Sequence, residues 1–330
     1  MPSISRRTLL ASAAASAAIG AVATRAQDAL AVPDTLAGKS ILITGTSSGF
    51  GRLMAESFAR KGAKVFATMR NLPRVEAADL EKLAAAEKLD LTVIGIDVRD
   101  DQQVADGVAR AEELAGGALD VLINNAGVST AGPIEIQDMA ATQLLFDTNV
   151  YGPQRMMRAA LPAMRKAGSG QIINVTSQLG RVLVPGFGQY SPSKFALEAM
   201  SEQIAYELVP HNIDVTIIQP GGYPTQIWAN ANELTQRLLD RAETRHLEGY
   251  PMMVEQLRNR ANNGGNTDPM DVPDAIAAII AMPPGTRPLR QPVHPGPKPQ
   301  IPVNAASRDA QLNWLGDSAY GPWVRAVHQA

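Results

Sequence analysis

The chain has 330 residues, of which 45% are hydrophobic, and its formal net charge at pH 7 is -2. This length can bury a full core in one large domain or two small ones. Proteins that bind nucleic acid usually carry a basic surface. The near-neutral charge of this chain does not indicate one, so nucleic acid is not an expected partner. The sequence has no cysteine, which excludes disulfides, thiolate metal sites and cysteine nucleophiles. Its four histidines show no ligand spacing, so we expect no metal site.

Residues 1–26 resemble an export signal of the twin-arginine type. Arg6 and Arg7 stand in the motif SRRTLL, and an Ala-rich stretch without charge then runs to Arg25. The first acidic residue is Asp28, and the preceding triplets AVA and TRA are candidate cleavage sites. A mitochondrial transit peptide, or a surface helix that stays attached, would share these features. We expect a periplasmic or exported protein, or a cytoplasmic one if the leader is not processed, without a stable membrane span.

Six short β-branched runs follow, each succeeded by a polar or helix-forming segment. Continuous apolar runs are typical of strands that are covered on both faces. Their alternation with helical segments predicts an α/β fold, a doubly wound parallel sheet with crossover helices. The runs are SILIT (40–44), KVFAT (64–68), LTVIGID (91–97), LDVLINN (119–125), QIINVTS (171–177) and IDVTIIQ (213–219).

The first run leads into a glycine-rich turn, TGTSSGFG, and then into a helical segment. Gly45 permits a tight turn, Gly49 lets the backbone approach a pyrophosphate, and Gly51 lets helix and strand pack closely. The helix N-terminus attracts phosphate charge. A turn that needs glycine only for its positive φ is the structural alternative.

The composition changes between residues 283 and 302, where eight of twenty positions are proline. We expect this part to be non-helical and to wrap the surface. Within it, RPLRQPV would form a seventh strand at a sheet edge.

The spacing TGxxxGxG resembles the short-chain dehydrogenase/reductase family, in its compact one-domain branch. Further motifs follow in the family's order, namely GIDVRD, NNAG, TNVYG, NVTSQ, YSPSK and PGGYPT. The resemblance implies a single Rossmann-like domain of about seven strands at 38–293, followed by a Pro-rich C-terminal extension at 294–330. It also implies cofactor contacts from Gly45, Ser47, Gly49, Phe50, Gly51, Asp97, Val98, Asn125, Ala126, Gly127, Tyr190, Lys194, Pro220, Gly221 and Thr225.

The choice of nicotinamide cofactor depends on the end of the second strand, VFATMRN. An acidic residue there binds the ribose 2′-hydroxyl and favours NAD(H). Met69 occupies that place and Arg70 follows it, and an arginine can pair with a 2′-phosphate. We therefore expect Arg70 to bind the cofactor and NADP(H) to be favoured over NAD(H), the alternative being a solvated arginine after a strand.

In YSPSK, Lys194 lies one helical turn after Tyr190, on the same face. A tyrosine in water has a pKa of about 10, and a nearby positive charge is expected to lower it toward the working pH. Pro192 fits the first turn of a helix. The pair is therefore a candidate general acid and base.

The resemblance assigns roles to two further residues. Ser177 would bind the substrate oxygen, and Asn149 would hold a water that connects Lys194 to solvent. A strand-end turn former for Ser177 and a satisfied buried amide for Asn149 stay open as alternatives. The implied reaction is hydride transfer between the nicotinamide and a carbonyl carbon, with Tyr190 as proton donor or acceptor and Lys194 holding the nicotinamide ribose.

The segment 222–268 is where the family places its substrate-binding helices. Its apolar residues fit an apolar alcohol or carbonyl substrate, or equally a packed lid. They are Trp228, Leu238, Tyr250, Met252 and Met253.

The extension at 294–330 lies beyond the ordinary family core. Trp314 and Trp323 would anchor it across a subunit contact, over the active site or on its own subunit. The family often forms homodimers or homotetramers. A non-catalytic nucleotide-binding sensor and a partner-binding descendant remain alternatives to an enzyme.

Overall fold

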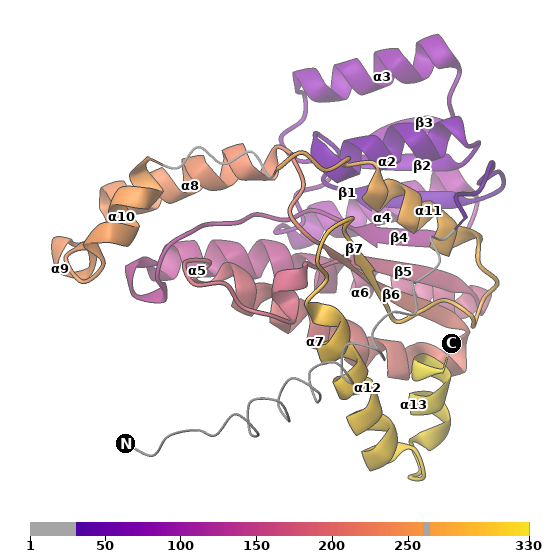
Figure 1. Cartoon of the computed structure of the whole chain (residues 1–330). Coiled ribbons are helices and arrows are strands. Elements are labelled where there is room, and N and C mark those ends of the chain that lie inside the picture. The colour runs from indigo at the N-terminus through magenta and orange to yellow at the C-terminus, as the bar shows by residue number, and fades with distance from the viewer. Residues whose placement is uncertain (1–30, 260–264, 330) are drawn as a thin grey trace. The chain divides into compact units, whose positions relative to one another are not determined.

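The computed structural model of the protein describes residues 31–259 and 265–329 (Figure 1). The expected export signal at 1–26 lies outside this part. In the part that is described, no helix combines the length and apolarity needed to cross a membrane.

Seven parallel strands form one sheet in the order β3-β2-β1-β4-β5-β6-β7. The predicted doubly wound sheet is therefore confirmed, and the seventh strand lies at an edge as expected. Each of the six predicted runs forms a strand. The strands are β1 (Ser40–Thr44), β2 (Lys64–Met69), β3 (Leu91–Gly95), β4 (Val121–Asn124), β5 (Gly170–Val175), β6 (Ile213–Pro220) and β7 (Arg290–Val293).

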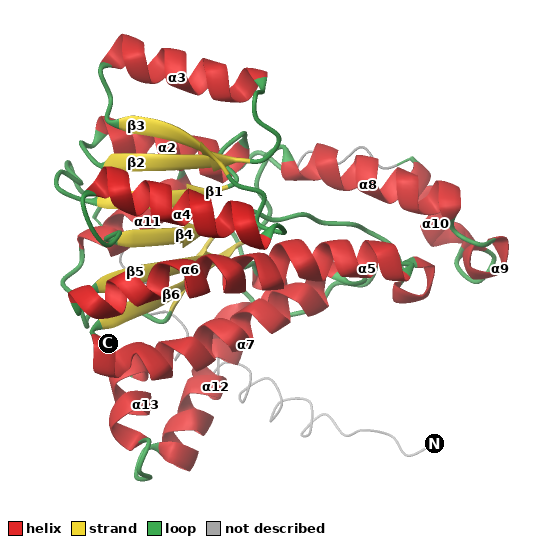
Figure 2. Ribbon diagram, turned by 180° about the vertical axis from the view of Figure 1, so that it is seen from behind, coloured by secondary structure: helices red, strands yellow, loops and turns green. Residues whose placement is uncertain are grey.

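Helices cover both faces of the sheet (Figures 1 and 2). On one face α2 and α11 lie side by side, and on the other α4 lies beside α6. The helices are α2 (Gly49–Arg60), α3 (Val75–Glu87), α4 (Asp101–Ala115), α5 (Met139–Phe146), α6 (Gly152–Ala167), α7 (Tyr190–Leu208), α8 (Ile227–Arg241), α9 (Thr244–Leu247), α10 (Pro251–Arg258), α11 (Asp271–Ala281), α12 (Gln300–Leu315) and α13 (Gly321–His328). Short turns of 3-10 helix, η1 (Ile134–Ile136), η3 (Gln178–Gly180) and η4 (Val209–His211), and one π-helical turn, η2 (Asp147–Tyr151), complete the described chain.

Local signals explain where helices begin and end, as α4 shows. The Asp100 side chain accepts hydrogen bonds from the backbone N–H groups of Gln102 and Gln103, which caps the first turn. Gly116 ends the helix with φ +77, the left-handed conformation that glycine adopts without strain.

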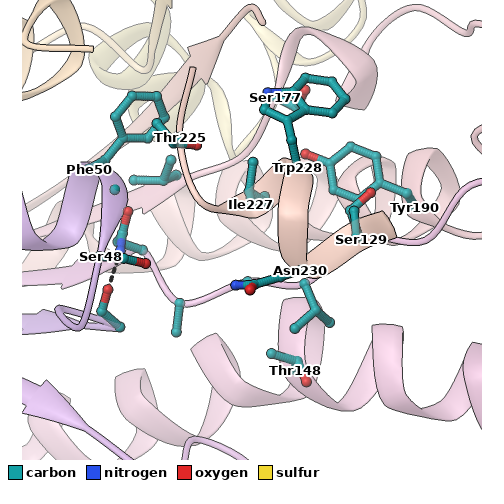
Figure 3. A pocket seen from close by; sticks show the side chains of 18 of the residues that line it. Ser48, Phe50, Ser129, Thr148, Ser177, Tyr190, Thr225, Ile227, Trp228 and Asn230 are labelled. Atoms are coloured by element: carbon teal, nitrogen blue, oxygen red, sulfur yellow. Dashed lines mark hydrogen bonds between the residues drawn. The ribbon is translucent and has the colours of Figure 1, made fainter. Parts of the chain in front are cut away.

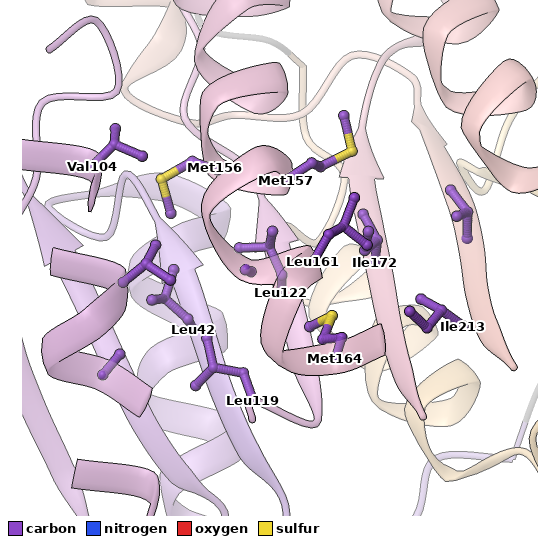
Figure 4. Close-up of a cluster of buried hydrophobic side chains, with 14 of the residues drawn as sticks. Leu42, Val104, Leu119, Leu122, Met156, Met157, Leu161, Met164, Ile172 and Ile213 are labelled. Atoms are coloured by element: carbon purple, nitrogen blue, oxygen red, sulfur yellow. The ribbon is translucent and has the colours of Figure 1, made fainter. Parts of the chain in front are cut away.

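A large core cluster lies between α6 and the sheet (Figure 4). Met156, Ala160 and Met164 repeat every four residues on one face of α6, which is the period of a buried helical stripe. They pack against Leu122 of β4 and Ile172 of β5, two central strands covered on both faces. This packing fixes the strands whose carboxyl ends carry the candidate site.

The Pro-rich segment is mostly non-helical, but the expectation is wrong at its end. Residues 300–302 form the start of α12. Pro302 is tolerated there because the first turn of a helix needs no hydrogen bond from its N–H groups. The extension then folds into α12 and α13, which contact each other, and α13 also packs against α7.

Candidate active site

A cavity of about 610 Å³ lies at the carboxyl ends of the strands (Figure 3). Parallel α/β sheets bind their ligands at this edge, where the strand order reverses between β1 and β4. All predicted site residues except Gly51 and Asn149 line this cavity. The two exceptions lie behind its wall and support it.

The glycine turn is packed too tightly for side chains. Gly45 has φ +72, and a Cβ there would lie 2.9 Å from the Cα of Ala126. A Cβ on Gly51 would lie 2.2 Å from the carbonyl oxygen of Gly45, so the first turn of α2 contacts the turn directly. Within the described chain the Ser48 side chain does not cap α2, which leaves first-turn N–H groups for an anion such as a phosphate.

The NNAG segment after β4 is tied to the same turn. Thr44 Oγ1 accepts hydrogen bonds from the backbone N–H groups of Asn125 and Ala126, at 2.9 and 3.0 Å. The Asn125 amide donates to the carbonyls of Thr44 and Gly45, at 2.8 and 3.2 Å. Asn125 therefore holds two loops at a fixed separation at the cavity edge.

Three arginines gather at one end of the cavity: Arg70, Arg74 and Arg99. Arg99 pairs with Asp97 at 2.8 Å. Burial raises the pKa of Asp97, but the Arg99 hydrogen bonds and the charges of Arg99 and Arg70 outweigh burial, and the pKa is below its ordinary value. The sequence reasoning missed Arg74 and Arg99, although Arg99 stands in the same GIDVRD motif as Asp97.

Tyr190 begins α7, and Lys194 lies one turn later with 4% of its surface exposed. The Lys194 Nζ donates to the Val175 carbonyl at 3.0 Å and lies 5.9 Å from the centre of the Tyr190 ring. Burial lowers the pKa of Lys194 to about 8, while the charge of Glu198 raises it. The ammonium therefore loses its proton not far above neutral pH.

The predicted direction of the Tyr190 pKa is wrong for this structure. Burial raises the pKa of the phenol, and a hydrogen bond with Ser177 opposes the rise only in part. The physical reason is the position of Lys194, whose Nζ lies over the ring and is bound to a backbone carbonyl. At neutral pH Tyr190 is thus a protonated phenol beside the Ser177 hydroxyl.

Asn149 lies in the π-helical turn η2 and is fully buried. Its Oδ1 accepts from the Val128 N–H and its Nδ2 donates to the Val128 carbonyl, each at 2.9 Å. Nδ2 also donates to Ser193 Oγ at 3.0 Å. The structural alternative for Asn149 is thus present in the structure, and the relay role stays a prediction. π-helical turns frequently occur at functional sites.

Phe187 and Trp228 form an aromatic wall of the cavity. The rings of Phe187 and Trp228 meet edge to face at 6.5 Å, and Phe187 lies 6.3 Å from Tyr190. The Trp228 Nε1 donates to the Tyr223 carbonyl at 2.7 Å, which fixes the ring beside Ser177 and Tyr190 (Figure 3). An apolar substrate group would fit against this wall.

Helices α8 to α10 span residues 227–258, and we call them the lid. Most of the apolar side chains expected to bind substrate there pack against other parts of the protein. Of the five apolar residues expected there, only Trp228 lines the cavity. Leu238 is buried in a cluster with Ile136 and Leu257, Met253 packs on the cluster, and Met252 is exposed. For most of these residues the packed-lid alternative therefore describes the structure.

Ion pairs and hydrogen bonds join the lid to the loop after β4. Arg241 pairs with Asp138 at 2.5 Å, and Asp138 also caps α5. His246 and Tyr250 both bind the Glu135 carboxylate, at 3.0 and 2.9 Å.

Among the residues with described placement, no group of three or more acidic or histidine side chains is arranged to hold a metal ion.

Residues 39–236 match the family model described as short chain dehydrogenase. Retinol dehydrogenase 8 of Bos taurus is 33% identical over 288 residues, which cover 83% of this chain and 87% of the relative. A short chain dehydrogenase/reductase from Burkholderia phymatum, solved in complex with NAD, has a TM-score of 0.68 and 26% identity, with 84% of this chain and 95% of that chain covered. A gluconate 5-dehydrogenase from Burkholderia cenocepacia, solved with NADP and tartrate, has a TM-score of 0.55 and 26% identity, with 59% and 75% covered. The chain therefore belongs to the short-chain dehydrogenase family and is an oxidoreductase with a nucleotide-binding fold.

Proposed function

We propose that the protein reduces an apolar carbonyl compound to its alcohol with NADPH, and catalyses the reverse reaction with NADP. The observation that carries this proposal is the meeting of Tyr190, Ser177 and Lys194 in one cavity beside the Phe187–Trp228 wall. The bound nicotinamide supplies or accepts the hydride. The protein's own groups orient the carbonyl and move the proton.

The geometry supports a division of work between the polar side chains. The Ser177 hydroxyl donates a hydrogen bond to the substrate oxygen, which places it beside the Tyr190 hydroxyl. Tyr190 then gives its proton to the alkoxide that develops on this oxygen. The raised pKa of Tyr190 suits this role because the phenol keeps its proton at neutral pH. Lys194 supplies positive charge beside the phenolate that remains, and the predicted Asn149 relay returns a proton from solvent to Tyr190 through Lys194.

The preference for NADP(H) rests on charge at the far end of the cavity. Met69 places no carboxylate there, and Arg70, Arg74 and Arg99 offer cations for a 2′-phosphate. Arg74 pairs with Glu76 and Arg99 with Asp97. Arg70 has no ion-pair partner among the described residues, so it is the cation most available to the phosphate. The similar structures contain either NAD or NADP, so only these side chains favour NADP(H).

The aromatic wall supports an apolar substrate, and the name of the retinol dehydrogenase relative, an enzyme for an apolar alcohol, points the same way. We further propose export by the twin-arginine route, which carries folded proteins and would allow the cofactor to travel in place. Assembly as a homodimer or homotetramer also remains a proposal, for which light scattering of the purified protein is the direct test.

The test is the change of nicotinamide absorbance with time. Purified protein is mixed with NADPH or NADH and with apolar aldehydes and ketones, with polyol-derived ketones as the polar comparison. We expect turnover with NADPH and the apolar compounds, and its loss in Tyr190→Phe. Firm NADPH binding without turnover of any compound would favour the nucleotide-binding sensor, and the absence of any nucleotide binding would overturn the proposal.

A further inference from the structure

The C-terminal extension holds the end of β6, the strand that leads into the predicted nicotinamide-binding residues Pro220 and Gly221. The Gly221 N–H donates to the Val293 carbonyl at 3.0 Å, and a Cβ on Gly221 would lie 2.5 Å from the His294 ring. Helix α12 adds a side-chain contact, because Asn304 Nδ2 donates to Gln219 Oε1 at 2.7 Å. The extension thus contacts this strand end through its first residue and through α12.

The Gln219 amide has one orientation that satisfies both of its ends. Gln219 is fully buried, and its Nε2 donates to Glu198 Oε1 at 2.9 Å. Its Oε1 faces the Nδ2 of Asn304. If the amide turned over, its oxygen would face the Glu198 carboxylate, and two acceptors would meet in a buried place. Asn304 therefore helps to fix the orientation that keeps Gln219 bound to Glu198.

Glu198 in turn connects the catalytic elements. It lies on α7 one turn after Lys194, with 1% of its surface exposed. Its Oε1 also accepts from Thr176 Oγ1 at 2.7 Å, and Thr176 directly precedes Ser177. Its Oε2 accepts from Arg290 Nε at 2.9 Å. One carboxylate thus ties together α7, the end of β5 and the end of β6.

We propose that Asn304 is a positioning residue for the reaction, acting through Gln219 and Glu198 to hold the ends of β5 and β6 against the catalytic face of α7. This inference rests on the proposed function, because the kcat measurements that test it require that function. Asn304 is partly exposed and touches none of the reacting atoms. Its removal changes the placement of Ser177, Pro220 and Lys194 relative to each other.

The first experiment compares Asn304→Leu with Asn313→Leu in the full chain. Asn313 is the matched control because it is an exposed asparagine on the same helix. We expect kcat with NADPH to fall roughly tenfold in Asn304→Leu, since a misplacement of catalytic groups by about 1 Å costs one or two orders of magnitude. The kcat of Asn313→Leu should equal that of the original protein. Equal kcat values for the two variants would overturn the proposal.

A binding measurement separates this inference from the proposed function. Binding of NADPH and of 2′,5′-ADP, which lacks the nicotinamide, is measured without any substrate. We expect Asn304→Leu to weaken NADPH binding several-fold and to leave 2′,5′-ADP binding unchanged, because residues 220–221 are predicted to bind the nicotinamide end. This result supports the positioning role even if no substrate is turned over. Unchanged NADPH binding, or equal weakening of both ligands, would contradict it.

A double-mutant cycle with Gln219→Leu tests the route of the effect. If Asn304 acts through Gln219, the double variant should be no worse in kcat and NADPH binding than Gln219→Leu alone. If the losses from the two single changes multiply in the double variant, Asn304 acts elsewhere and the proposed route is overturned.

If Asn304→Leu does not fold, Asn304→Asp replaces it, because the aspartate keeps the size and places an oxygen against Gln219 Oε1. A kcat for Asn304→Asp equal to that of the Asn313 control would then overturn the proposal.

Discussion

The strand ends at residues 44–177 and the chain from residue 221 onward hold the cavity in different ways. In the first region, backbone geometry places the groups: glycine turns, strand ends, and backbone N–H groups that donate to the side chains of Thr44 and Asn149. In the second, pairs of side chains from distant segments do so, namely Arg241 with Asp138, Arg290 with Glu198, and Asn304 with Gln219. Backbone constraints leave short motifs in a sequence, whereas distant side-chain pairs leave none.

The largest expected effect tests the motif-bearing region. In Tyr190→Phe we expect kcat to fall by about 10²- to 10⁴-fold, the contribution typical of a general acid, with NADPH binding retained. Rates are compared with Tyr320→Phe, which alters an exposed tyrosine. A variant Tyr190→Phe with more than a tenth of the original kcat would mean that another group donates the proton.

The next effect tests the side-chain pairs through stability. Arg290 is buried between Glu198 and Glu202, at 2.9 and 2.5 Å. Arg290→Met leaves two buried carboxylates without their cation, and we expect the free energy of unfolding to fall by about 3–5 kcal/mol. Denaturant unfolding gives this value, and the exposed pair in Arg308→Met should cost at most about 1 kcal/mol. Equal losses in both variants would show that the buried cluster contributes no more than a surface pair.

A charge reversal at the arginine end of the cavity should change cofactor preference. Arg70→Glu replaces a cation for the 2′-phosphate by a carboxylate that can accept from a ribose hydroxyl. We expect KM for NADPH to rise by about 10- to 100-fold, the loss of one charge-assisted contact, while KM for NADH stays the same or falls. Arg110→Glu, an exposed change on α4, is the control. An unchanged ratio of the two constants would assign the phosphate to Arg74 or Arg99.

The smallest effect is a shift in pH dependence. Lys194 is an ammonium below its pKa of about 8 and a neutral amine above it. Carbonyl reduction needs the charged form, so kcat/KM should decline as the pH rises past about 8. In Glu198→Gln the charge that raises the pKa of Lys194 is gone. The decline in kcat/KM should therefore begin at a pH lower by at least about 0.5 unit. The exposed change Glu207→Gln should leave the profile in place, and an upward shift in Glu198→Gln would contradict this assignment.

Much of the fold could be predicted because six of the strands are short apolar runs that alternate with helix-forming segments. The pairing of Tyr190 with Lys194 followed from their helical spacing, and the place of Ser177 beside them followed from the resemblance to the family. The direction of the Tyr190 pKa could not be predicted, since it depends on burial and on the bond between Lys194 and the Val175 carbonyl. Arg74 and Asn304 were missed because neither stands in a motif. Only the folding of the chain brings each of them to its place near the site.

The dependence of Gln219 on Asn304 also has a consequence for the newly made chain. On the ribosome, residues 40–225 emerge before α12, so all seven motifs of the family are available while Gln219 still lacks its partner. The sheet can assemble at this stage, because domains fold as their residues become available. With the proposed role of Asn304, the strand ends reach their final arrangement only after Asn304 has been synthesised, so the growing chain gains its full activity late, near the completion of its C-terminal helices.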